Sequence, residues 1–436
     1  PWPAGLKAAH PHRGVKVDTD PDALRVRSSI MVYRKSLPPV AALLTATAAS
    51  GQPFEYGPRE APHLEPAYPS QTQAPVLPRA HAVETAPIAE GLEHPWAIAE
   101  MPDGGFLVTE RPGRLRHVAA DGTISDPIAG VPEVENRAPE TGWSTQAGLL
   151  DVKLGPNFAD TRHIYFTYAK PVEDDMSVTA AARGTLNEDM TELTGVEDIF
   201  VQSPPSPTRM HYGSRIVFDG RGHAFITTGE HSALAERDFA QHLDTTYGKI
   251  VRVNLDGSIP DSNPFTDHDR ADPAIWSYGH RNVQGAAMHE GMLWTIEHGP
   301  AGGDELNLPL PGRNYGWPIV SYGVRYNGPS IGTGEARMAG FQEPLYFWDP
   351  VIAPGDMVFY EGDAFPAWEG DILAAALVTG GLVRLDMNGT LVAGEGRLLS
   401  DLGRVRDVEV LDDGTLAVAT DFEDGAIIHV TPAPSN

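Results

Sequence analysis

From about residue 84 onward, one short unit recurs six times along the chain. Each copy has a turn rich in Asp, Asn or Gly followed by a short β-type run, as in Pro102-Asp103-Gly104 ahead of Phe106-Leu107-Val108-Thr109-Glu110. A companion run that begins with glycine also repeats, and helical periodicity is nearly absent. The six copies lie at 102–110, 156–168, 219–230, 289–298, 361–385 and 412–421, and the companion runs at 113–118, 248–253, 381–385 and 425–430.

This repeat favours a β-propeller, because small sheets set around an axis leave only short, protected edges. Six blades would take about 58 residues each, so long loops are expected, and loops commonly carry function. A pair of β-sandwiches is the alternative, although that architecture does not need the same unit six times. We predict an all-β fold, with a six-bladed β-propeller as the catalytic domain over residues 83–436 and an extended, poorly structured segment before it.

Three stretches precede the predicted propeller. Residues 31–50 combine a basic start, a short apolar stretch and Ala46-Thr47-Ala48, a pattern typical of a signal peptide with a small-residue cleavage site. This predicts a periplasmic or secreted protein, the alternative being an uncleaved N-terminal arm. Residues 1–30 would be an upstream extension to which the sequence assigns no role. Residues 51–82 are rich in Pro, Glu and Gln and are expected to be an extended lead-in.

Composition excludes several classes of function. The chain has 32 basic and 59 acidic residues, a formal charge of −27, so nucleic-acid binding is not expected. It has no cysteine, which rules out disulfides, thiolate metal sites and cysteine nucleophiles. Apolar runs stay shorter than the roughly 18 residues that a membrane-spanning helix needs, so no membrane span is expected.

The segment from Glu297 to Pro318 concentrates the features of a metal site. Glu297-His298-Gly299-Pro300 is followed by Gly302-Gly303-Asp304-Glu305-Leu306-Asn307 and by Asn314-Tyr315-Gly316-Trp317-Pro318. Sharp backbone bends expose carbonyl oxygens beside carboxylates, and such oxygens are the ligands that Ca²⁺ prefers. A cation held in this bend would in turn attract an anionic cofactor.

Further polar segments flank the strands, where the loops of a propeller reach the axis. Arg404 and Arg406 alternate, so both are expected on one face of a strand. Two arginines on one face of an acidic protein suit a ligand rich in carboxylates, although a solvated edge is the simpler interpretation. A histidine beside Gly and Arg is likewise more often a loop hydrogen-bonding residue than a catalyst. The segments are 146–150, 211–215, 278–282 and 403–407.

Taken together, these motifs resemble the glucose/sorbosone dehydrogenase family, which includes the soluble PQQ-dependent aldose sugar dehydrogenases. The resemblance runs from Gly91 to Val430 and rests on the order of His94-Pro95-Trp96, Thr109-Glu110-Arg111-Pro112-Gly113-Arg114, Tyr278-Gly279-His280-Arg281-Asn282 and Glu297-His298-Gly299-Pro300. It implies a six-bladed propeller that binds pyrroloquinoline quinone (PQQ) and Ca²⁺. It also implies oxidation of the anomeric hydroxyl of an aldose sugar, or of a related alcohol or aldehyde, by hydride transfer to PQQ. An electron acceptor such as a quinone, a cytochrome or a dye would then reoxidise the cofactor.

The resemblance also implies roles for single residues. A histidine base is physically sensible, because a neutral imidazole can accept a proton near neutral pH. The resemblance makes His211 the general base and Gln146 a sugar contact. For the cofactor it implies that Arg281 polarises the quinone oxygen, that Asn282 and His298 lie beside PQQ, that Trp348 is an aromatic near its plane, and that Arg404 and Arg406 bind its carboxylates. For the metals it implies that the carbonyls of Gly299 and Pro300 bind the axial Ca²⁺, and that Glu305 and Tyr315 bind a second, structural Ca²⁺.

One position departs from the family pattern. Val378 stands where the family has a lysine that contacts PQQ. Valine cannot pair with a carboxylate, and loss of such a contact costs about 1.5–3 kcal/mol, or roughly ten- to a hundredfold in affinity. Val378 supports one alternative, a non-catalytic propeller module that has lost PQQ. A lactonase-type metal hydrolase is the other alternative; it would need several carboxylates and Asn as direct ligands at the axis, where the matched loops offer His and Arg.

Overall fold

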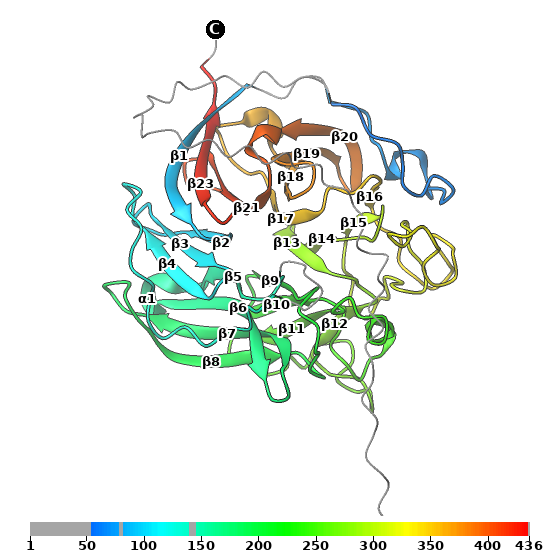
Figure 1. Ribbon diagram of the computed structural model, residues 1–436, viewed down its shortest axis with the longest axis horizontal. Helices are drawn as coiled ribbons and strands as arrows, with labels where there is room; N and C mark the ends of the chain where they lie inside the picture. The colour runs from blue at the N-terminus through cyan, green and yellow to red at the C-terminus, as the bar shows by residue number, and fades with distance from the viewer. Residues whose placement is uncertain (1–53, 78–81, 139–144, 435–436) are drawn as a thin grey trace, which may run out of the picture. The chain divides into compact units, whose positions relative to one another are not determined.

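The computed structural model describes residues 54–77, 82–138 and 145–434. Six antiparallel sheets surround a central axis, as Figure 1 shows, so the predicted six-bladed β-propeller is confirmed. The strands nearest the axis are β2, β5, β9, β13, β17 and β21, one from each sheet. The expected signal peptide at 31–50 and the upstream extension at 1–30 lie outside the described residues. Within the described ranges, no helix is long and apolar enough to cross a membrane.

The blades follow one another along the chain. Blade 1 contains β2 (Pro95–Glu100), β3 (Phe106–Glu110) and β4 (Arg114–Val118); blade 2 contains β5 (Leu149–Leu154), β6 (His163–Val172), β7 (Met176–Leu186) and β8 (Leu193–Val201); and blade 3 contains β9 (Gly213–Phe218), β10 (His223–Thr228), β11 (Lys249–Asn254) and β12 (Ile275–Tyr278).

The second half repeats this plan. Blade 4 contains β13 (Val283–His289), β14 (Met292–Glu297), β15 (Asp304–Asn307) and β16 (Tyr346–Trp348); blade 5 contains β17 (Pro354–Phe359), β18 (Ile372–Ala376), β19 (Leu382–Asn388) and β20 (Leu391–Leu398); and blade 6 contains β21 (Val405–Val410), β22 (Leu416–Thr420), β23 (Gly425–Pro432) and β1 (Val83–Leu92). The helical pieces are α1 (Phe158–Thr161), η2 (Pro69–Gln71), η3 (Arg237–Gln241), η4 (Pro366–Trp368) and η5 (Ser400–Leu402).

Each predicted turn-strand copy contains the turn of a blade's first hairpin, and the companion runs are the third strands β4, β11, β19 and β23. Blade 1 differs from the other blades, because its sheet has three strands among the described residues. After β4, Ile124 forms only an isolated bridge with Val118. Pro127 and Pro132 then follow, and proline lacks the N–H that a further strand would donate.

The first strand of the propeller closes its last blade. β1 pairs antiparallel with β23, from Val83 opposite Pro432 to Leu92 opposite Gly425. Figure 1 shows the two strands side by side although they come from opposite ends of the propeller sequence. Because Leu92 is fully buried against Ala417 and Ile427, the closure adds apolar packing to the backbone hydrogen bonds.

A buried ionic cluster joins four inner strands at the axis. Arg215 on β9 places Nη1 2.8 Å from Oδ1 of Asp151 and 3.1 Å from Oδ1 of Asp407, and Nε 3.2 Å from Oδ1 of Asp356. All four side chains are almost completely buried. Asp151 Oδ2 also accepts the N–H of Ile216 in the next blade, at 2.7 Å. These contacts fix the relative positions of the inner strands whose ends carry the site.

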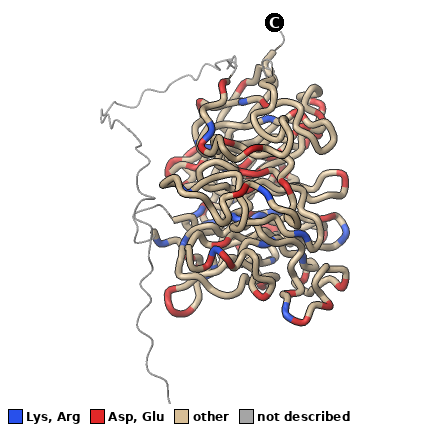
Figure 2. Tube along the Cα trace, turned by 90° about the vertical axis from the view of Figure 1, so that its right-hand side faces the viewer, with Lys and Arg blue, Asp and Glu red and all other residues tan. Residues whose placement is uncertain are grey.

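Residues 54–77 of the expected lead-in contain η2 and an isolated bridge between Val76 and Glu395. They pack against the propeller: the Tyr68 hydroxyl donates to the Leu345 carbonyl, and Gln71 Nε2 donates to the Pro344 carbonyl at 2.8 Å. The charge of the chain is visible in Figure 2, where Asp and Glu occupy many of the outer turns.

Candidate functional site

A buried histidine–carboxylate pair lies at the entrance to β9. His211 precedes the strand in a left-handed backbone conformation (φ 47°), and its Nδ1 lies 2.9 Å from Oε1 of Glu230. Glu230 is fully buried, and its Oε2 accepts the N–H of Ser232 at 2.9 Å. An ionised carboxylate can only accept, so Nδ1 of His211 carries the proton and Nε2 keeps its lone pair. His211 thus has a strained backbone conformation, and such strain is typical of functional sites.

Electrostatics keep this pair in the form that a base needs. Burial lowers the pKa of His211, and the charge of Arg281 lowers it further, while Glu230 opposes both. Burial alone would raise the pKa of Glu230, but the hydrogen bond with His211 and the charges of Arg281 and Arg237 lower it. The imidazole is therefore neutral and the carboxylate ionised near neutral pH.

Two predicted residues hold the backbone around His211. Oε1 of Gln146 accepts the N–H of His211 at 2.8 Å, and Oδ1 of Asn282 accepts the N–H of Gly213 at 2.9 Å. Gly229 has to be glycine, since a Cβ there would come within 1.8 Å of the His211 carbonyl oxygen. The structure thus brings Gln146, His211 and Asn282 together.

Arg281 lies between this pair and the Glu297 segment. Its Nη1 donates to the His298 carbonyl at 2.9 Å, its backbone N–H donates to Oε2 of Glu297 at 2.6 Å, and its guanidinium lies over the Trp317 ring. Its Nε is buried without a hydrogen-bond partner among the described residues. This unused donor fits an anionic or carbonyl oxygen from a bound ligand.

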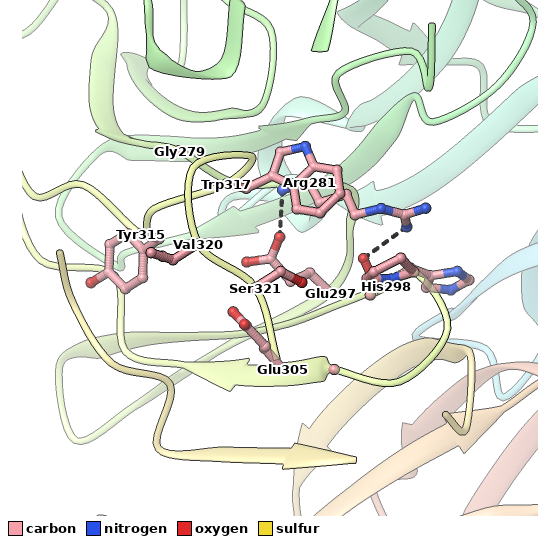
Figure 3. A pocket seen from close by; sticks show the side chains of 12 residues that line it. Gly279, Arg281, Glu297, His298, Glu305, Tyr315, Trp317, Val320 and Ser321 are labelled. Atoms are coloured by element: carbon pink, nitrogen blue, oxygen red, sulfur yellow. Dashed lines mark hydrogen bonds between the residues drawn. The ribbon is translucent and has the colours of Figure 1, made fainter. Parts of the chain in front are cut away.

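The Glu297 segment encloses a cavity of about 20 Å³, room for about one water molecule or one ion. Figure 3 shows Glu297 and Glu305 extending into it from neighbouring strands. The cavity is lined by Gly279, Arg281, Glu297, His298, Gly299, Pro300, Gly303, Glu305, Tyr315, Trp317, Val320 and Ser321.

The two glutamates form an acidic pair in which Glu297 is buried and Glu305 is half-buried. Glu297 on β14 is directly opposite Glu305 on β15, and Nδ2 of Asn307 donates to both carboxylates, at 3.0 and 3.1 Å. Burial raises the pKa of Glu305 well above its ordinary value, and the charge of Glu297 raises it further. A cation in the adjacent cavity would relieve this repulsion.

The loop between the two strands is tightly folded. The N–H of Gly299 donates to Oδ1 of Asp304 at 2.7 Å, and a Cβ on Gly299 would come within 2.2 Å of the Gly303 backbone. Asp304 also accepts the N–H groups of Ile352 and Ala353, at 2.9 and 2.7 Å. Asp304 is therefore committed to shaping the loop, which leaves main-chain carbonyls and Glu305 as the oxygens available to a metal. No group of three or more His, Asp or Glu that could hold a metal occurs in the part of the chain described.

Two predicted residues of this segment have their side chains engaged. The Tyr315 hydroxyl donates to the Leu308 carbonyl at 2.6 Å and accepts the N–H of Leu310, and Figure 3 shows it pointing away from the glutamates. Tyr315 can therefore offer a metal only its main-chain carbonyl in this arrangement. His298 Nε2 lies 2.7 Å from the Pro354 carbonyl, and burial lowers the pKa of His298 to about 3. His298 is thus neutral, with Nδ1 as its acceptor.

The two predicted arginines share one acid. Arg404 Nη2 and Arg406 Nη2 contact Oδ2 of Asp421 at 2.7 and 2.8 Å, and Arg406 Nη1 donates to Oε1 of Gln284 at 3.0 Å. Burial opposes ionisation of Asp421, but Arg406 and Arg404 hold its pKa well below the ordinary range. The charge of Arg111 also acts on Asp421, so three arginines surround one carboxylate and leave a net positive charge.

Trp348 and Val378 do not line the cavity. Trp348 lies on β16, the outermost strand of blade 4, and packs in a hydrophobic cluster with Tyr346 and Ile352. Trp317 is the tryptophan that lines the cavity. Val378 follows β18 and is 63% exposed.

Sequence reasoning missed several residues of the site, because their roles come from contacts with residues of other strands or other blades. Glu230 and Asp421 each follow a second strand, β10 or β22, which is the one local signal they share. The residues added by the structure are Arg111, Glu230, Gln284, Trp317 and Asp421.

Comparison with known proteins gives a consistent picture. The glucose/sorbosone dehydrogenase family model matches residues 92–429. Aldose sugar dehydrogenase YliI of Escherichia coli (strain K12) is 41% identical over 351 residues, which are 79% of this chain and 92% of that protein. The apo crystal structure of soluble aldose sugar dehydrogenase from Escherichia coli has a TM-score of 0.76 at 40% identity, covering 80% of this chain and 100% of that one.

A PQQ-bound aldose sugar dehydrogenase from Streptomyces coelicolor has a TM-score of 0.65 at 26% identity, covering 81% of this chain and 99% of that one. The family match spans five blades in full and most of blade 6, so it includes every residue of the site described above. The chain belongs to the glucose/sorbosone dehydrogenase family, as its motifs predict.

Proposed function

We propose that this protein is a quinoprotein dehydrogenase that oxidises the anomeric hydroxyl of aldose sugars, or a related alcohol or aldehyde, with PQQ and Ca²⁺ as cofactors. The observation that carries this proposal is the buried His211–Glu230 pair beside Arg281, next to an ion-sized cavity. The PQQ-bound relative supports the choice of cofactor.

The residues present fit both cofactors. Arg404 and Arg406 supply positive charge for carboxylates, and the buried Nε of Arg281 and of Arg406 lack partners among the described residues. Asn282 and His298 would complete the cofactor site, while the carbonyls of Gly299 and Pro300 would hold the axial Ca²⁺. When bound, PQQ supplies a quinone carbonyl that accepts hydride, and Ca²⁺ polarises that carbonyl.

The protein's own residues would manage the proton. Nε2 of His211 accepts the proton of the sugar hydroxyl as the C–H bond gives up hydride. Glu230 keeps the imidazole in the tautomer with a free Nε2 and then stabilises the imidazolium that forms. Gln146 holds the His211 backbone through its Oε1 and would also contact the sugar. Burial of the pair limits competing protonation by water.

A second cation would have a structural role beside Glu305. The cavity has room for about one ion, and the paired Glu297 and Glu305 carboxylates with the main-chain carbonyl of Tyr315 would hold this second cation there. The axial Ca²⁺ would then lie outside the cavity, at the carbonyls of Gly299 and Pro300. Such a cation would tie β14 and β15 to the loop at residues 314–317.

Reconstitution tests the proposed function directly. Metal-free apoprotein should oxidise glucose with an artificial dye only after PQQ and Ca²⁺ are added together, and bound PQQ should show quinone absorbance. If the protein showed no activity and no quinone absorbance after both additions, the non-catalytic module would be the better description. Hydrolysis of a lactone by the metal-loaded protein without PQQ would instead favour the hydrolase.

A variant of the base tests the assigned mechanism. His211→Ala should lower kcat by about a hundredfold or more while the dissociation constant of PQQ changes little, because general bases contribute about 10²–10⁴ in rate. His223→Ala is the matched control, since His223 pairs with Asp219 at 2.6 Å in the first hairpin of blade 3, apart from the site. Full kcat in His211→Ala would refute the role of His211.

Export to the periplasm or medium is also part of the proposal. It rests on the sequence pattern at residues 31–50. Cell fractionation of the protein with an intact and with a scrambled 31–50 segment would test it. The intact protein should be found in the periplasm or medium, and the scrambled variant should stay in the cytoplasmic fraction. The electron acceptor would then be a redox partner accessible in the same compartment.

A further inference from the structure

The lead-in residues 54–77 lie outside the stretch matched by the family model, yet they contact the loop beneath the proposed axial metal site. Their anchor is the side chain of Asp349, which is fully buried just after β16. Oδ1 of Asp349 accepts the N–H of Glu60 at 2.6 Å, and Oδ2 accepts the N–H of Ala61 at 3.1 Å and Nε of Arg59 at 3.2 Å. Three consecutive lead-in residues thus converge on one carboxylate.

The same carboxylate lies against the metal-site loop. A Cβ on Gly302 would come within 2.9 Å of Oδ1 of Asp349, so the loop passes directly over the carboxylate. The next residue, Gly303, donates its N–H to the Trp348 carbonyl at 2.9 Å. Gly302 and Gly303 therefore contact the end of β16, at Trp348 and Asp349, where the lead-in is attached.

A small apolar cluster covers the loop from its outer side. Ala61 and Leu64 are buried and pack with Val324 and Ala301. Ala301 in turn exchanges two backbone hydrogen bonds with Val324, at 2.9 and 3.0 Å. The lead-in thus covers residues 301–303 on one side, while Gly299 and Pro300 line the cavity.

We propose that residues 59–64 form a strap that positions the loop at 299–303, with Asp349 as its anchor, and thereby sets the affinity of the proposed axial Ca²⁺ site. This inference rests on the proposed function for the identity of the metal. Carbonyl ligands carry no charge of their own, so their affinity for Ca²⁺ depends on how well they are pre-positioned. The loop contains three glycines, which on their own favour many backbone conformations. Outer groups that hold metal ligands in place commonly matter about tenfold or more in affinity.

Calorimetric titration of metal-free, full-length protein with Ca²⁺ alone tests the strap. Asp349→Asn keeps the shape of the side chain but removes its charge and one acceptor oxygen, so Ca²⁺ should bind about ten- to a hundredfold more weakly. Arg59→Gln removes one of the three donors and should weaken binding less, and it keeps the test valid if Asp349→Asn does not fold. Tyr68→Phe is the matched control, because it removes a hydrogen bond from the lead-in to Leu345, apart from the loop.

The outcomes separate the two proposals. Weaker Ca²⁺ binding in Asp349→Asn and Arg59→Gln, with Tyr68→Phe unchanged, would support the strap. Unchanged binding in the folded anchor variants would overturn the strap and leave the metal site standing. Equal weakening in Tyr68→Phe would also overturn it, since the effect would then reflect general loss of stability. No Ca²⁺ binding by the wild-type protein would overturn the proposed metal site itself.

Discussion

At the scale of single residues, His211 shows how neighbours select one state of a side chain. Burial and Arg281 lower its pKa, while Glu230 holds the proton on Nδ1 and raises the pKa in part. The imidazole acts as a base only when it is neutral, above its pKa. Activity should therefore fall on the acid side, with a midpoint below the ordinary histidine value of about 6.5.

Replacing Glu230 tests this balance. Glu230→Gln keeps an acceptor for Nδ1 but removes the negative charge that raises the pKa of His211, so the acid limb of kcat/KM should move to lower pH. The maximal kcat should fall by about tenfold or more, because the imidazolium loses its counter-ion. A pH-rate profile measures both effects. Glu361→Gln is the control, since Glu361 is largely exposed and lies 3.4 Å from His289 in another blade. A shift of the limb to higher pH would contradict the assigned role.

The exposed Val378 gives a second test at this scale. The neighbouring Leu377 carbonyl accepts Nη1 of Arg404 at 3.3 Å, so position 378 lies next to the proposed binding site for cofactor carboxylates. Val378→Lys should strengthen PQQ binding by about tenfold, because an added ammonium can pair with a carboxylate. Fluorescence titration of apoprotein with PQQ measures the change. Val201→Lys, at another exposed valine, should leave the affinity unchanged. An unchanged affinity in Val378→Lys would mean that the cofactor does not reach this position.

At the scale of strands, the local pattern predicted the blades but not their closure. The six first hairpins and four third strands could be identified because turn residues and alternating runs lie close together in sequence. The pairing of β1 with β23 brings together residues more than 300 positions apart, and neither strand signals its partner. Blade 1 lacks a fourth strand among the described residues, and Pro127 and Pro132 are the local signal for this.

The residues of the site also fall into two groups, those that local motifs identify and those that only the fold brings into contact. The segments that contain His211, Arg281 and Glu297 were identifiable by their motifs, and the structure brings them together. Glu230, Gln284 and Asp421 were not, because each acts by contacting a residue from a different strand or blade. The two tryptophans are a similar case: Trp317 and Trp348 each lie within two residues of a proline, and only the fold shows that Trp348 lies on an outer strand.

The axial ionic cluster gives a prediction about the joined inner strands. Arg215→Met removes the cation that contacts Asp151, Asp356 and Asp407 together. Lys153, 3.8 Å from Oδ2 of Asp356, would then be the nearest remaining cation among the described residues, and Asp151 and Asp407 would lose their ion-pair partner. Breaking a buried pair in this way costs about 3–5 kcal/mol of unfolding free energy. Guanidinium denaturation measures the loss. Arg183→Met removes a more exposed pair with Glu197 and should cost at most about 1 kcal/mol. Similar losses in the two variants would show that the cluster does not hold the blades together.

At the scale of the whole molecule, a strongly acidic protein contains a locally basic site. The formal charge is −27, and Figure 2 shows acidic residues in many outer turns. Yet Arg111, Arg404 and Arg406 surround Asp421 with excess positive charge. The local arginines would favour an anionic cofactor at short range, whereas the net charge would govern the approach of larger redox partners from a distance.

This contrast predicts opposite salt effects on reoxidation of the reduced enzyme. A cationic acceptor such as hexaammineruthenium(III) should be attracted at low ionic strength and slow down by about tenfold or more as salt is added, because screening removes the attraction. An anionic acceptor such as ferricyanide should speed up over the same range. Stopped-flow rates at constant pH measure both, and a neutral quinone serves as the control, with little expected change. If the two charged acceptors responded alike, the local arginines or the acceptor chemistry, rather than the charge of −27, would dominate the encounter.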